Sequence, residues 1–146
     1  MAQPRIGQKV VVDVPATTAN LGPGFDCLGA ALDLNNRFAM RRIEGNGERF
    51  ELIIEGTEGS HLRGGPDNLV YRAAQRVWKA ASMEPVALEA RVRLAVPPAR
   101  GLGSSATAIV AGLMGANALV GEPLSKEKLL ELAIDIEGYP DNVVPS

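Results

Sequence analysis

Apolar and polar residues alternate along several stretches of the chain, and such alternation predicts β-strands with one buried face. The pattern is clearest in the stretch that ends at Val14 and in the one that begins at Leu88. We expect strands at 9–14, 37–43, 50–55 and 88–96. The Asn46-Gly47 pair lies between the second and third of these strands and favours a hairpin that joins them. The apolar segment 29–34 fits a strand or a helix equally.

Later segments place apolar residues three and four positions apart, which predicts helices at 67–81, at 104–120, and from Ser125 to Gly138 after Pro123. The middle helix carries no charge, and its most apolar part, 106–120, is shorter than the about 20 residues that span a bilayer. We therefore expect it to be buried against a sheet. The order of elements predicts an α+β fold, a two-layer sandwich with helices on one face of a mixed sheet.

Composition narrows the class of protein further. The chain has 146 residues, 46% of them apolar, and a formal net charge of −2, which is typical of one globular domain. No basic run exceeds Arg41-Arg42, so we expect no nucleic-acid partner. The single cysteine, Cys27, excludes an internal disulfide and suits a reducing compartment. The N-terminus lacks the apolar stretch of a signal peptide, so we expect a cytoplasmic protein without a membrane partner.

The segment from Pro97 to Ala108 has the character of a phosphate-binding loop. Gly101 and Gly103 let the main chain approach an anion closely, and the helix that follows offers free N–H groups at its first turn. A Walker loop requires a lysine immediately before its Ser or Thr, and here Gly103 precedes Ser104. A dinucleotide fingerprint follows its strand directly, whereas here residues 97–100 separate the strand from the glycines. A plain turn, with Ser104 as the N-cap of the helix, is the alternative.

Two further blocks flank this loop, at 14–26 and at 137–142. In this order the three blocks resemble the signatures of the GHMP kinases, and the outer two resemble the homoserine kinase branch, although Tyr139 stands where that branch commonly has histidine. The resemblance spans 10–145. It implies a fold similar to domain 2 of ribosomal protein S5 and an ATP-binding N-terminal kinase domain over 1–146. Family members continue into a second domain, so we expect this sequence to be the truncated N-terminal part of a longer chain.

The resemblance implies that ATP and Mg²⁺ serve to phosphorylate the side-chain hydroxyl of L-homoserine, a step in threonine biosynthesis. It implies that the loop and one residue near the adenine and ribose hold the nucleotide: Pro98, Ala99, Arg100, Gly101, Leu102, Gly103, Ser104, Ser105, Ala106, Thr107 and Asn68. For Asn68 the residue pattern itself favours a helix cap, with Pro66 and Asp67 before it.

The same resemblance assigns the remaining roles. Mg²⁺ would lie between Ser105 and Glu131, Asn20 and Asp26 would bind the amino acid, and Asn142 would act beside the substrate. An amide cannot take a proton at neutral pH, so the implied mechanism is direct in-line attack without a strong general base. The residue pattern also allows an interpretation without any function at these positions. Glu131 is then a solvated helix residue, and Asn20, Asp26 and Asn142 are then residues of turns.

Two other functions stay open on the sequence. One is a nucleotide-binding fragment without catalytic activity, and the other is a kinase for another small alcohol such as mevalonate. A homodimer is the candidate assembly.

Overall fold

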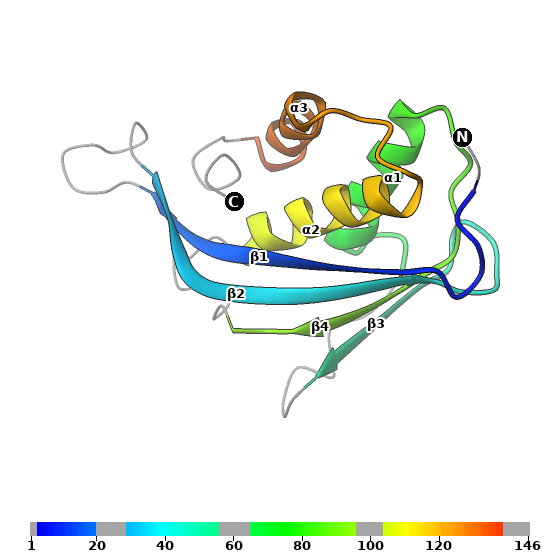
Figure 1. Cartoon of the computed structure of the whole chain (residues 1–146), viewed down its shortest axis with the longest axis horizontal. Helices are drawn as coiled ribbons and strands as arrows, with labels where there is room; N and C mark the ends of the chain where they lie inside the picture. Colours follow the sequence, from blue (N-terminus) through cyan, green and yellow to red (C-terminus); the bar gives the residue numbers. More distant parts are fainter. Residues whose placement is uncertain (1–2, 20–28, 56–64, 96–103, 139–146) are drawn as a thin grey trace.

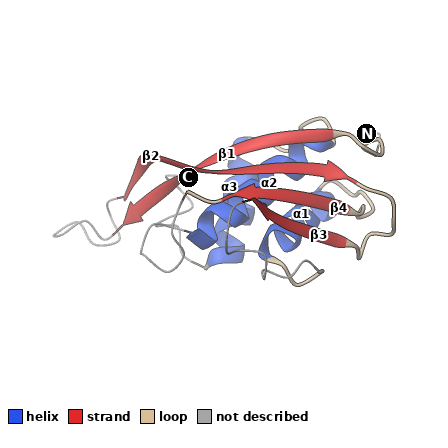
Figure 2. Cartoon of the chain, turned by 90° about the horizontal axis from the view of Figure 1, so that it is seen from below, coloured by secondary structure: helices blue, strands red, loops and turns tan. Residues whose placement is uncertain are grey.

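The computed structural model describes residues 3–19, 29–55, 65–95 and 104–138. In these ranges the helices cover one face of a mixed β-sheet and leave the other face open (Figure 1 and Figure 2). This arrangement confirms the predicted α+β sandwich. The elements are β1 (Lys9–Ala19), β2 (Gly29–Arg42), β3 (Phe50–Glu55), α1 (Leu69–Ala80), β4 (Leu88–Arg93), α2 (Ser104–Leu119) and α3 (Lys126–Glu137).

The strands follow the order β1-β2-β4-β3 across the sheet. β2 pairs antiparallel with both β1 and β4, whereas β3 pairs in parallel with β4. The predicted hairpin between 37–43 and 50–55 is therefore wrong, because β4 lies between these strands. The Asn46 turn instead leads the chain around the start of β4, where Ile43 N–H donates to Ala87 O and Leu88 N–H donates to Arg49 O, both at 3.1 Å.

The ambiguous segment 29–34 is the first part of β2. It pairs with the end of β1, with Ala19 opposite Gly29, after a register shift between Pro15 and Thr17. β2 pairs with β4 only from Arg37 onward. The end of β1 and the start of β2 therefore form a two-stranded arm that extends beyond the rest of the sheet (Figure 1).

The helix α2 is buried, as its lack of charge predicts. It packs between the sheet and the other helices, and its glycines allow a close approach: Gly112 lies against the Val70 carbonyl of α1 and Gly115 against the Met40 side chain of β2. The predicted ends of α3 are confirmed, with Ser125 as N-cap and Gly138 as a left-handed C-cap. Within the described ranges, no helix combines the length and apolar character needed to cross a bilayer.

The open face of the sheet carries charged side chains, as predicted for 88–96. They form ion pairs. Three cross between neighbouring strands, Arg37–Asp13 at 2.8 Å, Arg41–Glu89 at 3.1 Å and Arg93–Glu55 at 3.2 Å, and one lies along β4, Arg91–Glu89 at 3.2 Å. The hydrogen bond from Arg37 lowers the pKa of Asp13 below its usual value. β4 ends earlier than predicted, at Arg93, and Leu94 is 39% exposed instead of buried.

Candidate functional site

The first turn of α2 meets the end of α3, and both belong to segments in which the sequence predicts site residues. The arm of β1 and β2, the start of α2 and the end of α3 lie on the same side of the molecule (Figure 1). α2 has no acidic residue in its first turn. The first N–H groups of a helix have no partner within it, and they carry the positive end of its dipole. This end of α2 is therefore suited to an anion.

A carboxylate from α3 reaches this turn. Ser105 Oγ donates to Glu137, at 3.1 Å from Oε1 and 3.4 Å from Oε2. Glu137 is the last residue of α3, where a negative charge is unfavourable to its own helix dipole. Its position is explained by the neighbouring α2 turn, where a carboxylate is favoured and can join the serine hydroxyl in holding a cation.

The family resemblance assigns the carboxylate role to Glu131, which stays a prediction, and the carboxylate that contacts Ser105 in the structure is that of Glu137. The side chain of Glu131 is 69% exposed and forms an ion pair with Lys128 at 3.2 Å. Glu131 and Glu137 are six residues apart, and over six residues of an α-helix the side-chain direction rotates by one full circle and about 240° more. The two glutamates therefore point in different directions from α3. The sequence offered one signal for Glu137, its place immediately before the helix-ending Gly138.

Ser105 and Glu137 have oxygen donors of the type and spacing that suit Mg²⁺. A hydroxyl and a carboxylate are hard oxygen donors of the kind that this cation takes. Two oxygens bound at about 2.1 Å and at right angles to each other lie about 3.0 Å apart, close to the 3.1 Å between Ser105 Oγ and Glu137 Oε1. In the part of the chain that the structure describes, no group of three or more His, Cys, Asp or Glu side chains could hold a metal ion.

Two other predicted loop residues have side chains that face the interior. Ala106 is fully buried, and Thr107 is 1% exposed, with its hydroxyl accepting a hydrogen bond of 3.0 Å from Asn36 Nδ2. These two residues can therefore offer only their main-chain N–H groups to an anion at the first turn of α2. Ser105, by contrast, is exposed, and its hydroxyl donates to Glu137.

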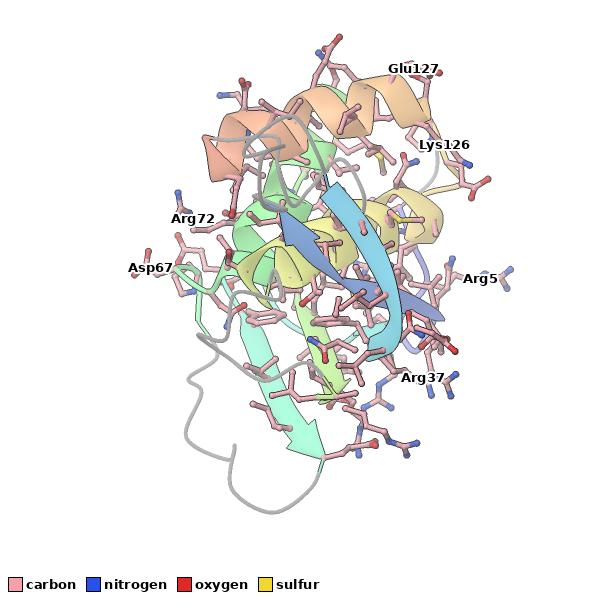
Figure 3. All side chains as sticks on the ribbon, turned by 90° about the vertical axis from the view of Figure 1, so that its left-hand side faces the viewer. Arg5, Arg37, Asp67, Arg72, Lys126 and Glu127 are labelled. Carbon is pink, nitrogen blue, oxygen red and sulfur yellow. The ribbon has the colours of Figure 1, made fainter. Side chains whose placement is uncertain are left out.

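Asn68 is the N-cap of α1, which confirms the cap interpretation. Its Oδ1 accepts from Val70 N–H at 2.9 Å, and its carbonyl accepts from Arg72 N–H, also at 2.9 Å. Asp67 and Arg72, on either side of this cap, lie on the opposite flank of the molecule from Arg5 and Arg37 (Figure 3). A role of Asn68 in nucleotide binding stays a prediction.

The remaining predicted site residues lie outside the described ranges. They are the loop residues Pro98, Ala99, Arg100, Gly101, Leu102 and Gly103, the amino-acid ligands Asn20 and Asp26, and Asn142.

Comparison with known proteins gives consistent matches. The family model of the GHMP kinases N terminal domain matches residues 68–146. A homoserine kinase of Parasynechococcus marenigrum (strain WH8102) is 97% identical over the whole chain, which covers 46% of that protein. The chain thus spans about half the length of the curated relatives it matches.

Solved structures agree with the fold. The crystal structure of a homoserine kinase from Cytophaga hutchinsonii has a TM-score of 0.83 and 29% identity, over 99% of this chain and 48% of the other. A putative homoserine kinase from Listeria monocytogenes has a TM-score of 0.71 and 39% identity, over 94% and 46%. By fold, by the matched family model and by its close relatives, this chain belongs to the GHMP kinases, as part of their N-terminal domain.

Proposed function

We propose that the protein containing this chain transfers the γ-phosphoryl group of ATP to the side-chain hydroxyl of L-homoserine. The bond between the γ-phosphorus and the β–γ bridging oxygen breaks, a bond from phosphorus to the hydroxyl oxygen forms, and the hydroxyl proton is released. The products are ADP and O-phospho-L-homoserine. The observation that carries this proposal is the Ser105–Glu137 pair at the first turn of α2, in a chain whose relatives at 81–97% identity are named homoserine kinase.

The described residues supply charge and position. The first turn of α2 directs N–H groups and its dipole at the phosphates, which stabilises the charge that builds on them during transfer. Ser105 and Glu137 would hold Mg²⁺, which when bound neutralises phosphate charge. A loose transition state needs little deprotonation of the attacking hydroxyl. The amide of Asn142 therefore serves to orient the substrate, beside Asn20 and Asp26, which bind the amino acid.

The substrate assignment is tested by ADP release from the full-length protein with ATP and Mg²⁺. L-Homoserine, mevalonate and galactose are compared at equal concentration. Release that depends on homoserine supports the proposal, and release that depends on another alcohol overturns the assignment of the substrate. ATP binding without turnover on any alcohol would indicate a nucleotide-binding protein without kinase activity.

The assignment of the cation ligand is tested by two matched substitutions on one helix. Glu137→Gln is expected to lower kcat about 100-fold or more, since loss of this kind of charge stabilisation costs 10² or more, and to raise the Mg²⁺ concentration required. Glu131→Gln removes an exposed charge and is expected to leave both unchanged. The reverse result would return the ligand role to Glu131.

Assembly and location are part of the same proposal. A homodimer in the cytoplasm is expected, and light scattering of the purified full-length protein measures the assembly directly.

A further inference from the structure

Asn36 lies between the end of β4 and the first turn of α2, and it is 1% exposed. On β2 it comes just before Arg37, the first residue that pairs with β4. The chain leaves the sheet after Arg93, so the next main-chain groups lose their strand partner. The Asn36 side chain replaces that partner, because its Oδ1 accepts from Ala95 N–H at 2.8 Å.

The other half of the same amide contacts the helix. Asn36 Nδ2 donates to Thr107 Oγ1 at 3.0 Å, and Thr107 is also 1% exposed. Asparagine is suited to this place because one neutral group both donates and accepts. Ala95 and Thr107 stand immediately before and after the segment 96–106 that contains the proposed phosphate-binding glycines. One buried side chain on β2 thus joins the two ends of that segment.

We propose that Asn36 is a positioning residue for phosphate binding: through Thr107 it fixes the first turn of α2 against Ala95 at the end of β4, so that the N–H groups of this turn meet the nucleotide already in place. This role rests on the proposed function, which supplies the ligand. A helix turn that lacks such a contact with the sheet opens more often. The apparent affinity for a ligand falls by the fraction of molecules in the competent arrangement. Loss of the Asn36 hydrogen bonds is therefore expected to weaken nucleotide binding, although Asn36 does not touch the nucleotide itself.

The chain provides a matched control at the other end of α2. Asn117 is 5% exposed, donates from Nδ2 to Leu124 O at 3.0 Å, and accepts from Leu124 N–H at 3.0 Å. It makes the same pair of hydrogen bonds on the same helix, away from the phosphate segment. A loss of stability alone would affect Asn36 and Asn117 variants alike.

The test compares Asn36→Ala, Thr107→Val and Thr107→Ser with Asn117→Ala in the full-length protein. Calorimetry measures the dissociation constant of ATP with Mg²⁺, and thermal unfolding measures stability. Asn36→Ala and Thr107→Val are expected to raise the dissociation constant about tenfold, the size of effect that one lost buried hydrogen bond produces. Thr107→Ser keeps the hydroxyl and is expected to bind as the wild type does. Asn117→Ala is expected to lower the unfolding temperature and leave the dissociation constant unchanged.

A second readout does not depend on the nucleotide. Hydrogen exchange of the main-chain N–H groups from Ala108 to Val110, measured without ATP, reports how often the first turns of α2 open. Asn36→Ala and Thr107→Val are expected to accelerate this exchange about tenfold, since exchange follows the population of open arrangements, and Asn117→Ala is not. If the wild type binds no ATP, the proposed function fails while the exchange rates still decide the role of Asn36. Equal behaviour of the Asn36, Thr107 and Asn117 variants in both readouts would overturn the inference. If Asn36→Ala does not fold, Thr107→Val carries the same comparison.

Discussion

Replacing Gly112 with alanine tests the close packing of α2 against α1. A Cβ at this position would lie 2.3 Å from the carbonyl oxygen of Val70 and 2.7 Å from the Cβ of Ala73. Neither atom can rotate away, because the first is main chain and the second is bonded directly to it. The two helices would have to separate by roughly 1 Å, and a gap of that size forfeits up to half of the dispersion energy of the contacts it opens.

The magnitude follows from two opposing terms. Alanine in a helix interior is favoured over glycine by about 1 kcal/mol. Overpacking a core costs about 1–3 kcal/mol, and a main-chain obstacle places Gly112→Ala at the upper end. We expect a net loss of about 2 kcal/mol, which lowers the unfolding temperature of a domain of this size by about 4–8 °C.

Gly115→Ala is the matched comparison on the same helix. Its Cβ would meet the Sδ of Met40 at 2.2 Å, but a methionine side chain has flexible torsions and can move aside. The helix-propensity gain then offsets much of the cost, and we expect a change within about 1 kcal/mol of zero. Thermal unfolding of both variants in the full-length protein is the assay. A Gly112→Ala protein as stable as the wild type, or more stable than Gly115→Ala, would refute the reasoning.

Two further predictions concern Tyr71 and Gly138. Burial, together with the charge of Glu48, raises the pKa of Tyr71 to about 12, and its hydroxyl donates to the carbonyls of Gly47 and Val86. Because the unfolded tyrosine ionises near pH 10 and the folded one does not, stability should fall between about pH 10 and 12. Tyr71→Phe should remove that part of the pH dependence and cost about 1–2 kcal/mol at neutral pH, as measured by urea unfolding across this range. Gly138 has φ +86°, and the place that a Cβ would take there is open space. Gly138→Ala should therefore cost about 1–2 kcal/mol through backbone strain alone, and Gly138→Asn should lose less in the same assay.

Local signals predicted much of this fold. The absence of charge between Gly101 and Gly121 correctly predicted a buried helix, and the caps at Asn68 and Ser125 were visible as residue types before an apolar periodic run. These features depend on short stretches of chain. Burial and capping are decided there by chemistry that the neighbouring residues already show.

The wrong strand pairing, and the choice between two glutamates that the sequence leaves open, both concern contacts between distant residues. Asn46-Gly47 makes a turn, but whether two strands pair across a turn depends on which other strand competes for the place, and here β4 takes it. Glu131 and Glu137 are both plausible on α3 alone. Only the packing of α3 on α2 decides which of them faces Ser105.

The place of β4 between β2 and β3 has a consequence for synthesis on the ribosome. β1 and β2 can pair as soon as both have emerged, whereas β3 must wait for α1 and β4 to follow. At about 5–20 residues per second this delay lasts roughly 2–8 s. During it the apolar residues Phe50 and Leu52, which later join the core, have no sheet to cover them. The nascent protein is then most exposed to aggregation, and chaperone binding at β3 would be most useful.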